Sequence, residues 1–244
     1  MELNINKHEE YLKDVIILAG EILLESGAGG YRIEQTMNQI ARHFGYADCN
    51  SFVTNTVINF SLHDLTYPRV KRVTARNTNL IKVSRVNAVA HQITSDQLTV
   101  EEALEKLKVI QDQSESYPAH YKAVASALVG LSFLYLQSGD MQNIATAMIA
   151  AAAGFFVKER VASIVQSLFI PEFIGALLIA FIVIAMNHGL TDPELSVTLI
   201  AAVMPIVPGV LITNSLQDLL AGNLMMALTK GLEAAVTSFA IGQV

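Results

Sequence analysis

The sequence lacks most of the residues from which covalent and metal frameworks are built. Its 244 residues include one cysteine, Cys49, and no tryptophan. A single cysteine excludes an intrachain disulfide framework and a cysteine-rich metal site. The 6 histidines are scattered without the i,i+3 or i,i+4 pairing of a zinc site. We therefore expect neither a bound metal nor a cofactor.

Positive charge and catalytic motifs are also scarce. The chain has 16 Lys and Arg against 22 Asp and Glu, a formal net charge of −6. Nucleic-acid binding needs a strong basic surplus, so DNA and RNA are excluded as main partners. Neither a Gly-x-Ser-x-Gly elbow nor a Ser/His/Asp arrangement is recognisable. The sequence does not predict an enzyme.

Hydrophobic residues, by contrast, are abundant and unevenly placed. They make up 52% of the chain, and the mean hydropathy is +0.42. Residues 1–118 hold 12 Lys and Arg and 15 Asp and Glu, whereas residues 119–244 hold only 4 and 7. This asymmetry predicts a small α+β domain over 1–118 and a membrane domain over 119–244.

The second half contains apolar stretches that approach the ~20 helical residues needed to cross a ~30 Å hydrocarbon core. We expect five transmembrane helices, over about 121–137, 141–157, 169–187, 195–213 and 224–242. The predicted fold class is thus an α-helical membrane protein of five transmembrane helices, preceded by the small α+β domain.

The basic residues predict the orientation, because Lys and Arg are retained on the cytoplasmic side of short loops. Lys158 and Arg160 follow the second span, whereas 138–140 and 188–194 contain no Lys or Arg. We expect a multi-pass protein of the cell (inner or plasma) membrane, in contact with lipid, with a cytoplasmic amino-terminal domain and its carboxyl terminus outside. Because the number of spans is odd, a second unit of the same fold that followed this one would have the inverted orientation in the membrane, as in many transporters. We expect such a second half to be another polypeptide.

The periodicity of the first half predicts its elements. A helix is expected over 9–26 and a second over 33–44. The glycine-rich stretch Ser26–Gly30 follows a helix and lacks the Lys-Ser/Thr of a nucleotide loop, which favours a helix connector over a phosphate cradle. An alternating strand is expected over 51–62. A turn at His63–Asp64 is expected to lead into a second strand through Val73, which Pro68 confines to a sheet edge.

Two further helices are expected in this half. Apolar residues recur at helical spacing over 80–93, and Thr99 begins a capping box for the last helix. Between the strands and these helices lies a basic run of Arg69, Lys71, Arg72 and Arg76. Such a run is a solvated face by default. The alternatives are contact with anionic headgroups or attraction of an anionic solute.

The fourth span is the most informative membrane segment. Pro205 and Pro208 each remove a backbone donor, and with Gly209 they predict a broken helix whose freed carbonyls face a solute or ion. Asn214 and Asp218 are four residues apart, so they share one helix face. A place for Asp218 in a cytoplasmic loop is the alternative.

The fifth span carries two charges, Lys230 and Glu233, three residues apart. A charge at the centre of a membrane helix costs at least ~2.5 kcal/mol, so such a pair is a functional candidate. The alternative is a structural pair that holds the helix to the bundle.

Taken together, these segments resemble the bacterial threonine/serine exporter family. The resemblance is to its larger, amino-terminal half, which many bacteria encode separately from a smaller membrane partner. In the first domain the matching stretches are 23–28, 31–34, 69–73, 79–87 and 99–104. In the membrane domain they are 208–209, 213–214, 218–219, 221–222 and 230–234. Their order and spacing together carry the resemblance.

The resemblance implies that this chain is half of a secondary exporter and works with the smaller subunit in an oligomer. The exported solute would be threonine, serine or a dicarboxylate such as succinate. We expect export to be driven by the proton gradient. Asn214, Asp218 and the Pro208–Gly209 break would line the substrate path, with Lys230 and Glu233 as a coupling or gating pair. The alternative function is a membrane-anchored cytoplasmic binding or sensor module without transport activity.

Overall fold

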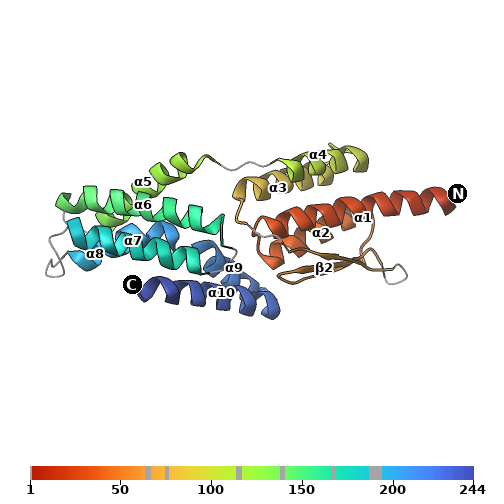
Figure 1. Ribbon diagram of the computed structural model, residues 1–244. Helices are drawn as coiled ribbons and strands as arrows, with labels where there is room; N and C mark the ends of the chain where they lie inside the picture. Colours follow the sequence, from red (N-terminus) through yellow and green to blue (C-terminus); the bar gives the residue numbers. More distant parts are fainter. Residues whose placement is uncertain are drawn as a thin grey trace. The chain divides into compact units, whose positions relative to one another are not determined.

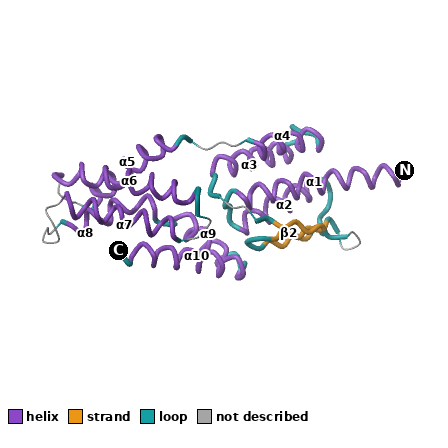
Figure 2. Tube along the Cα trace, in the orientation of Figure 1, coloured by secondary structure: helices purple, strands orange, loops and turns teal. Residues whose placement is uncertain are grey.

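The computed structural model describes residues 2–63, 67–74, 77–113, 117–137, 141–165, 167, 169–186 and 194–244. Within these ranges helices dominate, and the strands form one small sheet (Figures 1 and 2). The chain divides into two compact units. The first comprises residues 1–116 and 210–231, and the second comprises residues 117–209 and 232–244.

Helices α1 (Glu2–Glu25) and α2 (Gly30–His43) form the centre of the first unit. The helical spacing of apolar residues in α2 is the reason that Ile33, Met37 and Ile40 are buried together against α1. The two predicted helices are confirmed. The connector between them, residues 26–29, is the predicted glycine-rich turn, and Gly27 has a φ of +79° that favours glycine.

The sheet packs against these helices with three antiparallel strands in the order β1 (Asn50–Val53), β2 (Val57–Ser61), β3 (Arg69–Arg72). The predicted edge strand is confirmed as β3, which begins just after Pro68. The predicted turn at His63–Asp64 lies partly outside the described residues.

The single strand expected over 51–62 is wrong, because the chain reverses in its middle. The Thr54 N–H donates to the Val57 carbonyl at 2.8 Å, and the Thr54 hydroxyl accepts from the Val57 N–H at 3.1 Å. Threonine side chains stabilise turns in this way. The alternating pattern runs straight through the turn, and the sequence reading therefore missed it.

Helices α3 (Leu80–Thr94) and α4 (Val100–Asp112) complete this group and agree with the predicted helices. The capping box is present: the Thr99 hydroxyl accepts from the Glu102 N–H at 3.3 Å, and the Glu102 carboxylate accepts from the Thr99 N–H at 2.9 Å. These bonds satisfy amide donors that a helix start leaves unpaired.

The first unit also includes a helical hairpin from far along the chain, α9 (Gly209–Leu220) and the first turns of α10 (Leu224–Gly242). Gly222, with a φ of +86°, allows the sharp turn between them. The Asn223 N–H donates to the Asp218 carbonyl at 2.8 Å, and the Ser215 hydroxyl donates to the Ala227 carbonyl at 2.7 Å. The sequence reading had placed this hairpin in the membrane half.

The second unit is a helical bundle of α5 (Ala119–Leu136), α6 (Ile144–Ala162), α7 (Ile170–Met186) and α8 (Leu195–Val203). Small residues allow α6 and α7 to approach closely. A Cβ added at Gly154 would lie 2.3 Å from Ile179 Cγ1 and 2.9 Å from the Gly175 carbonyl oxygen. Close backbone approach at small residues is typical of helices packed in membranes.

Two helices in the described ranges, α5 and α10, are long and apolar enough to cross a membrane. A third span is present if α8 and the short helix Met204–Ile206 form one span with α9, across a break bent by 69°. Helix α7 is apolar but shorter, and α6 carries Lys158, Glu159 and Arg160 near its end. Five transmembrane helices remain a prediction.

We predict that Gly154→Ala destabilises the bundle, because the new methyl group meets backbone that cannot move aside. Overpacking of this kind costs roughly 1–3 kcal/mol. The midpoint of thermal unfolding in detergent measures the loss. Gly242→Ala is the matched control, since a Cβ there meets nothing within 4 Å. Equal midpoints for the two variants would contradict the close packing.

Candidate functional site

Three predicted site residues, Asn214, Asp218 and Lys230, come together in the hairpin of the first unit. Asp218 is 0% exposed and Lys230 is 4% exposed. Lys230 Nζ lies 3.3 Å from Asp218 Oδ2. Asp218 lies in α9 and Lys230 in α10. The geometry is a buried ion pair, which is tolerated only when its remaining hydrogen-bonding capacity is satisfied.

The connector between α1 and α2, together with the first turn of α2, satisfies that capacity. Asp218 Oδ1 accepts from the Tyr31 N–H at 2.9 Å, and Lys230 Nζ donates to the Ala28 carbonyl at 2.9 Å. Asn214 Nδ2 donates to the Gly27 carbonyl at 2.8 Å. Backbone groups of residues 27–31 thus bind all three polar side chains.

Helix polarity explains why each charge is where it is. The carboxylate of Asp218 lies at the amino end of α2, where the helix dipole is positive. The residue at the N-cap position is Gly29, which provides no side-chain cap, so Asp218 caps α2 from a distant segment. The ammonium of Lys230 lies at a carbonyl just beyond the carboxyl end of α1, where the dipole favours a cation.

The glycines of the connector make this approach possible. A Cβ added at Gly30 would lie 3.0 Å from Met226 Cγ and 3.4 Å from Asp218 Oδ1. A Cβ at Gly29 would lie 3.5 Å from the same oxygen. The hairpin therefore packs directly against the backbone of Gly29 and Gly30, which carries no side chain. This use of the glycine-rich stretch was not visible in the sequence, although its position between two helices was.

Two further residues join the hairpin to this region, and the sequence analysis did not select them as site residues. Asn223 Nδ2, in the turn of the hairpin, donates to Glu34 Oε2 at 3.0 Å. The other oxygen of Glu34 accepts from the Val53 N–H at 3.0 Å. The one signal for Glu34 was its place in a stretch that resembles the exporter family, and Asn223 had none.

The remaining predicted path residues lie elsewhere. Pro205, Pro208 and Gly209 belong to the second unit, where they end the short helix Met204–Ile206 and begin α9. The predicted break is present. Glu233, half-buried, follows Lys230 by one turn of α10 and belongs to the second unit. Its pairing with Lys230 remains a prediction, and the sequence had not indicated Asp218 as a partner of that lysine.

The basic run of β3 is balanced by acidic residues of α1. Arg69 hydrogen-bonds to Glu10 and to Asp14. Lys71 Nζ lies 3.0 Å from Glu21 Oε1. These ion pairs hold the edge strand β3 against α1. They neutralise the positive charges of Arg69 and Lys71, which the sequence analysis considered for binding an anionic ligand.

The same network sets the acidity of one of its carboxylates. The hydrogen bond from Lys13 lowers the pKa of Glu10; desolvation opposes this shift, and Arg69 adds to it. Arg72 is exposed. Arg76 lies outside the described residues, so a contact of this run with headgroups or solute stays a prediction.

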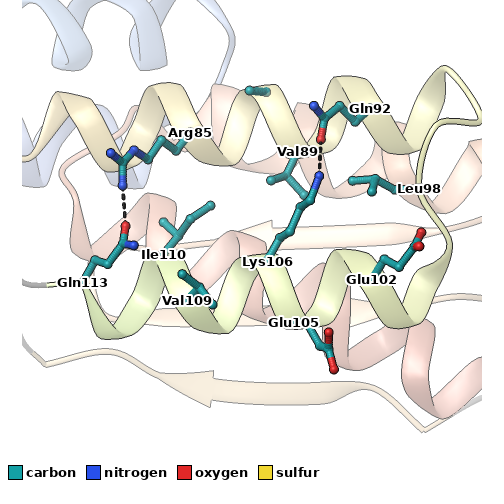
Figure 3. Close-up of a pocket in the computed structure, with 11 residues that line it drawn as sticks. Arg85, Val89, Gln92, Leu98, Glu102, Glu105, Lys106, Val109, Ile110 and Gln113 are labelled. Carbon is teal, nitrogen blue, oxygen red and sulfur yellow. Dashed lines mark hydrogen bonds between the residues drawn. The ribbon is translucent and has the colours of Figure 1, made fainter.

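A surface groove of about 650 Å3 between α3 and α4 is a separate candidate (Figure 3). Figure 3 shows that its polar side chains bond across it: Arg85 donates to Gln113, and Lys106 donates to Gln92 at 3.0 Å. Among the described residues no group of three His, Cys, Asp or Glu side chains is placed to hold a metal ion. The buried ion pair is the stronger site.

We predict that Lys230→Met strongly destabilises the protein, because it leaves Asp218 buried and unpaired. Breaking a buried pair costs about 3–5 kcal/mol. The double variant Asp218→Asn/Lys230→Met should recover part of the loss, since the new amide oxygen still accepts from the Tyr31 N–H. Thermal unfolding in detergent measures both.

The matched control for this prediction is Lys122→Met. Lys122 pairs with Glu159 at 2.7 Å, with side chains 29% and 30% exposed. Loss of an exposed pair costs about 1 kcal/mol or less. An equal loss of stability in Lys122→Met and Lys230→Met would argue against a special role for the buried pair.

Comparison with known proteins identifies the family. The family model of threonine/serine exporters matches residues 14–244. A protein of Mycobacterium tuberculosis (strain ATCC 25618 / H37Rv) named "Probable threonine/serine exporter" is 21% identical over 227 residues, which are 91% of this chain and 43% of that protein. The chain thus spans less than half the length of this curated relative. No solved structure matches. Because the family model covers nearly the whole chain, this protein belongs to the threonine/serine exporter family.

Proposed function

We propose that the chain is one half of a secondary exporter that moves threonine, serine or a dicarboxylate such as succinate across the cell membrane. Its family supports a transport role. The resemblance of the chain to the larger, amino-terminal half of the exporter family supports a second, smaller membrane subunit that supplies the other half. A transport role also accounts for the apolar helices α5 and α10.

The buried Asp218–Lys230 pair is the observation that carries the proposal. A small amino acid has one carboxylate and one ammonium group, and a dicarboxylate has two carboxylates. Lys230 and the Tyr31 N–H are the kinds of donor that bind a carboxylate, whereas Asp218 and the Ala28 carbonyl are acceptors for an ammonium. Asn214 adds an amide next to them.

The proposal includes an arrangement in the membrane. The amino-terminal domain, residues 1–118, is cytoplasmic, residues 119–244 form five transmembrane helices, and the carboxyl terminus is outside. The Pro205–Gly209 break and the polar face of α9 line the substrate path. Asp218 and Glu233 are the acidic groups available to couple export to the proton gradient. The assembly is an oligomer.

We predict that export requires both subunits. Cells that express this chain, with or without the smaller membrane protein of the same family, are loaded with a threonine-containing dipeptide or with labelled succinate. Efflux of one solute only when both chains are present is the expected result. No efflux of either solute, with both chains made and inserted, would contradict the proposal and favour the sensor module.

Asn214→Ala tests the substrate path in the same assay. Loss of the amide should reduce the export rate at least tenfold at equal expression, because loss of a substrate contact of about 1.4 kcal/mol changes a rate tenfold. Asn143→Ala is the control, since Asn143 at the start of α6 makes no side-chain cap bond. Equal export rates for the two variants would show that Asn214 does not line the substrate path.

A further inference from the structure

The hairpin of α9 and the start of α10 is held in the first unit by an unusual kind of contact. The large apolar cluster of this unit draws its fully buried side chains from residues 12–110, and Met226 alone comes from the hairpin. The other contacts described above are polar. They come from Asn214, Asp218, Asn223 and Lys230, and each binds within residues 27–34.

Polar contacts of this kind can be released at a small net cost. A hydrogen bond that is exchanged for bonds to water changes the free energy by only about 0.5–1.5 kcal/mol, whereas exposing a buried apolar side chain costs about 1.5–3 kcal/mol. An ion pair that leaves a dry interior also regains its hydration. Docking of the hairpin on the connector is therefore suited to repeated opening and closing.

The ends of the hairpin are suited to movement as well. α9 follows the break at Pro208, where the Gly209 N–H donates to the Val207 carbonyl at 2.8 Å, a shorter reach than the i−4 bond of an α-helix. Gly222, in the turn, has a φ of +86°. Hinges consist of a few residues at the ends of elements that absorb large changes in φ and ψ.

We propose that the α9–α10 hairpin is a gate, closed in this structure, that leaves residues 27–34 in each transport cycle. This inference rests on the proposed function and adds to it. It makes the connector between α1 and α2 one edge of the gate, and so gives the amino-terminal unit a part in transport. Opening exposes the Asp218–Lys230 pair on the hairpin and frees the Tyr31 N–H and the Ala28 carbonyl.

Glu34 is the positioning residue of this gate. Its Oε1 is fixed by the Val53 N–H at the end of β1, so its Oε2 is presented to Asn223 from a rigid support. The Glu34 carboxylate therefore determines the position at which the turn of the hairpin docks when the gate closes. It acts through Asn223 and does not need to touch the solute.

A disulfide across the gate tests the proposal. In a Cys49→Ser background, Gly30→Cys and Met226→Cys place one thiol near the present Met226 Cγ, which is 3.0 Å from a Cβ at residue 30. Neither substitution replaces a side chain that makes a polar contact of the gate. Export by the assembled transporter is measured before oxidation, after oxidation and after reduction, with the disulfide quantified by gel shift.

We expect oxidation of the double variant to reduce export at least tenfold and reduction to restore it. The single variant Met226→Cys, oxidised in the same way, should keep its rate. Undiminished export by a fully cross-linked transporter would overturn the gate. Absence of export by the wild-type pair of subunits would instead count against the proposed function, so the two failures are distinguishable.

A second cross-link covers the case in which the double variant is inactive before oxidation. Glu34→Cys and Asn223→Cys are joined by a short bifunctional thiol reagent, and Gln92→Cys with Lys106→Cys, which spans the α3–α4 groove, is the control (Figure 3). The gate requires loss of export in the first pair and none in the second. Equal responses of the two pairs would contradict it.

Discussion

The buried pair of Asp218 and Lys230 is the constraint on which the arrangement of the first unit depends. Two opposite charges with little exposure must be satisfied completely, and no single segment of this chain does so. The Tyr31 N–H and the Ala28 carbonyl complete the set, 187 and 202 residues away in sequence. The charge pair thus determines both the position of the hairpin and the need for bare backbone in the connector.

This constraint links local backbone chemistry to the proposed transport function. Because Gly29 offers no cap, the first amide groups of α2 need an acceptor, and a carboxylate from another helix provides it. Because the hairpin contributes only Met226 to the apolar cluster, the acceptor remains removable. In the proposed gate, the end of α2 exchanges the Asp218 carboxylate for a group of the solute. A small polar metabolite carries the same chemical groups.

Short-range features of the fold were predictable from the sequence. The periodicity of α1 to α4, the capping box at Thr99 and the proline break before α9 each depend on neighbours within a few residues. The turn at Thr54 was missed because its hydroxyl contact left the alternating pattern intact.

The polar side chains of the site were predictable from the sequence, but their partners were not. Asn214, Asp218 and Lys230 were selected as polar groups in apolar surroundings, which is a property of each segment alone. Their partners in the connector, and the link between Glu34 and Asn223, arise from contacts between distant segments that no local pattern encodes. Hydropathy likewise does not reveal that the hairpin packs with residues 1–116, because its apolar residues do not show what binds its polar face.

Hydrogen exchange at the connector tests the central claim most directly. If Asp218 holds the hairpin on α2, its replacement in Asp218→Ala should increase amide exchange within residues 27–34 at least tenfold, because the Tyr31 N–H loses its acceptor. Exchange in α4, outside the contact, should be unchanged. Unaltered exchange within residues 27–34 of a folded variant would contradict the account.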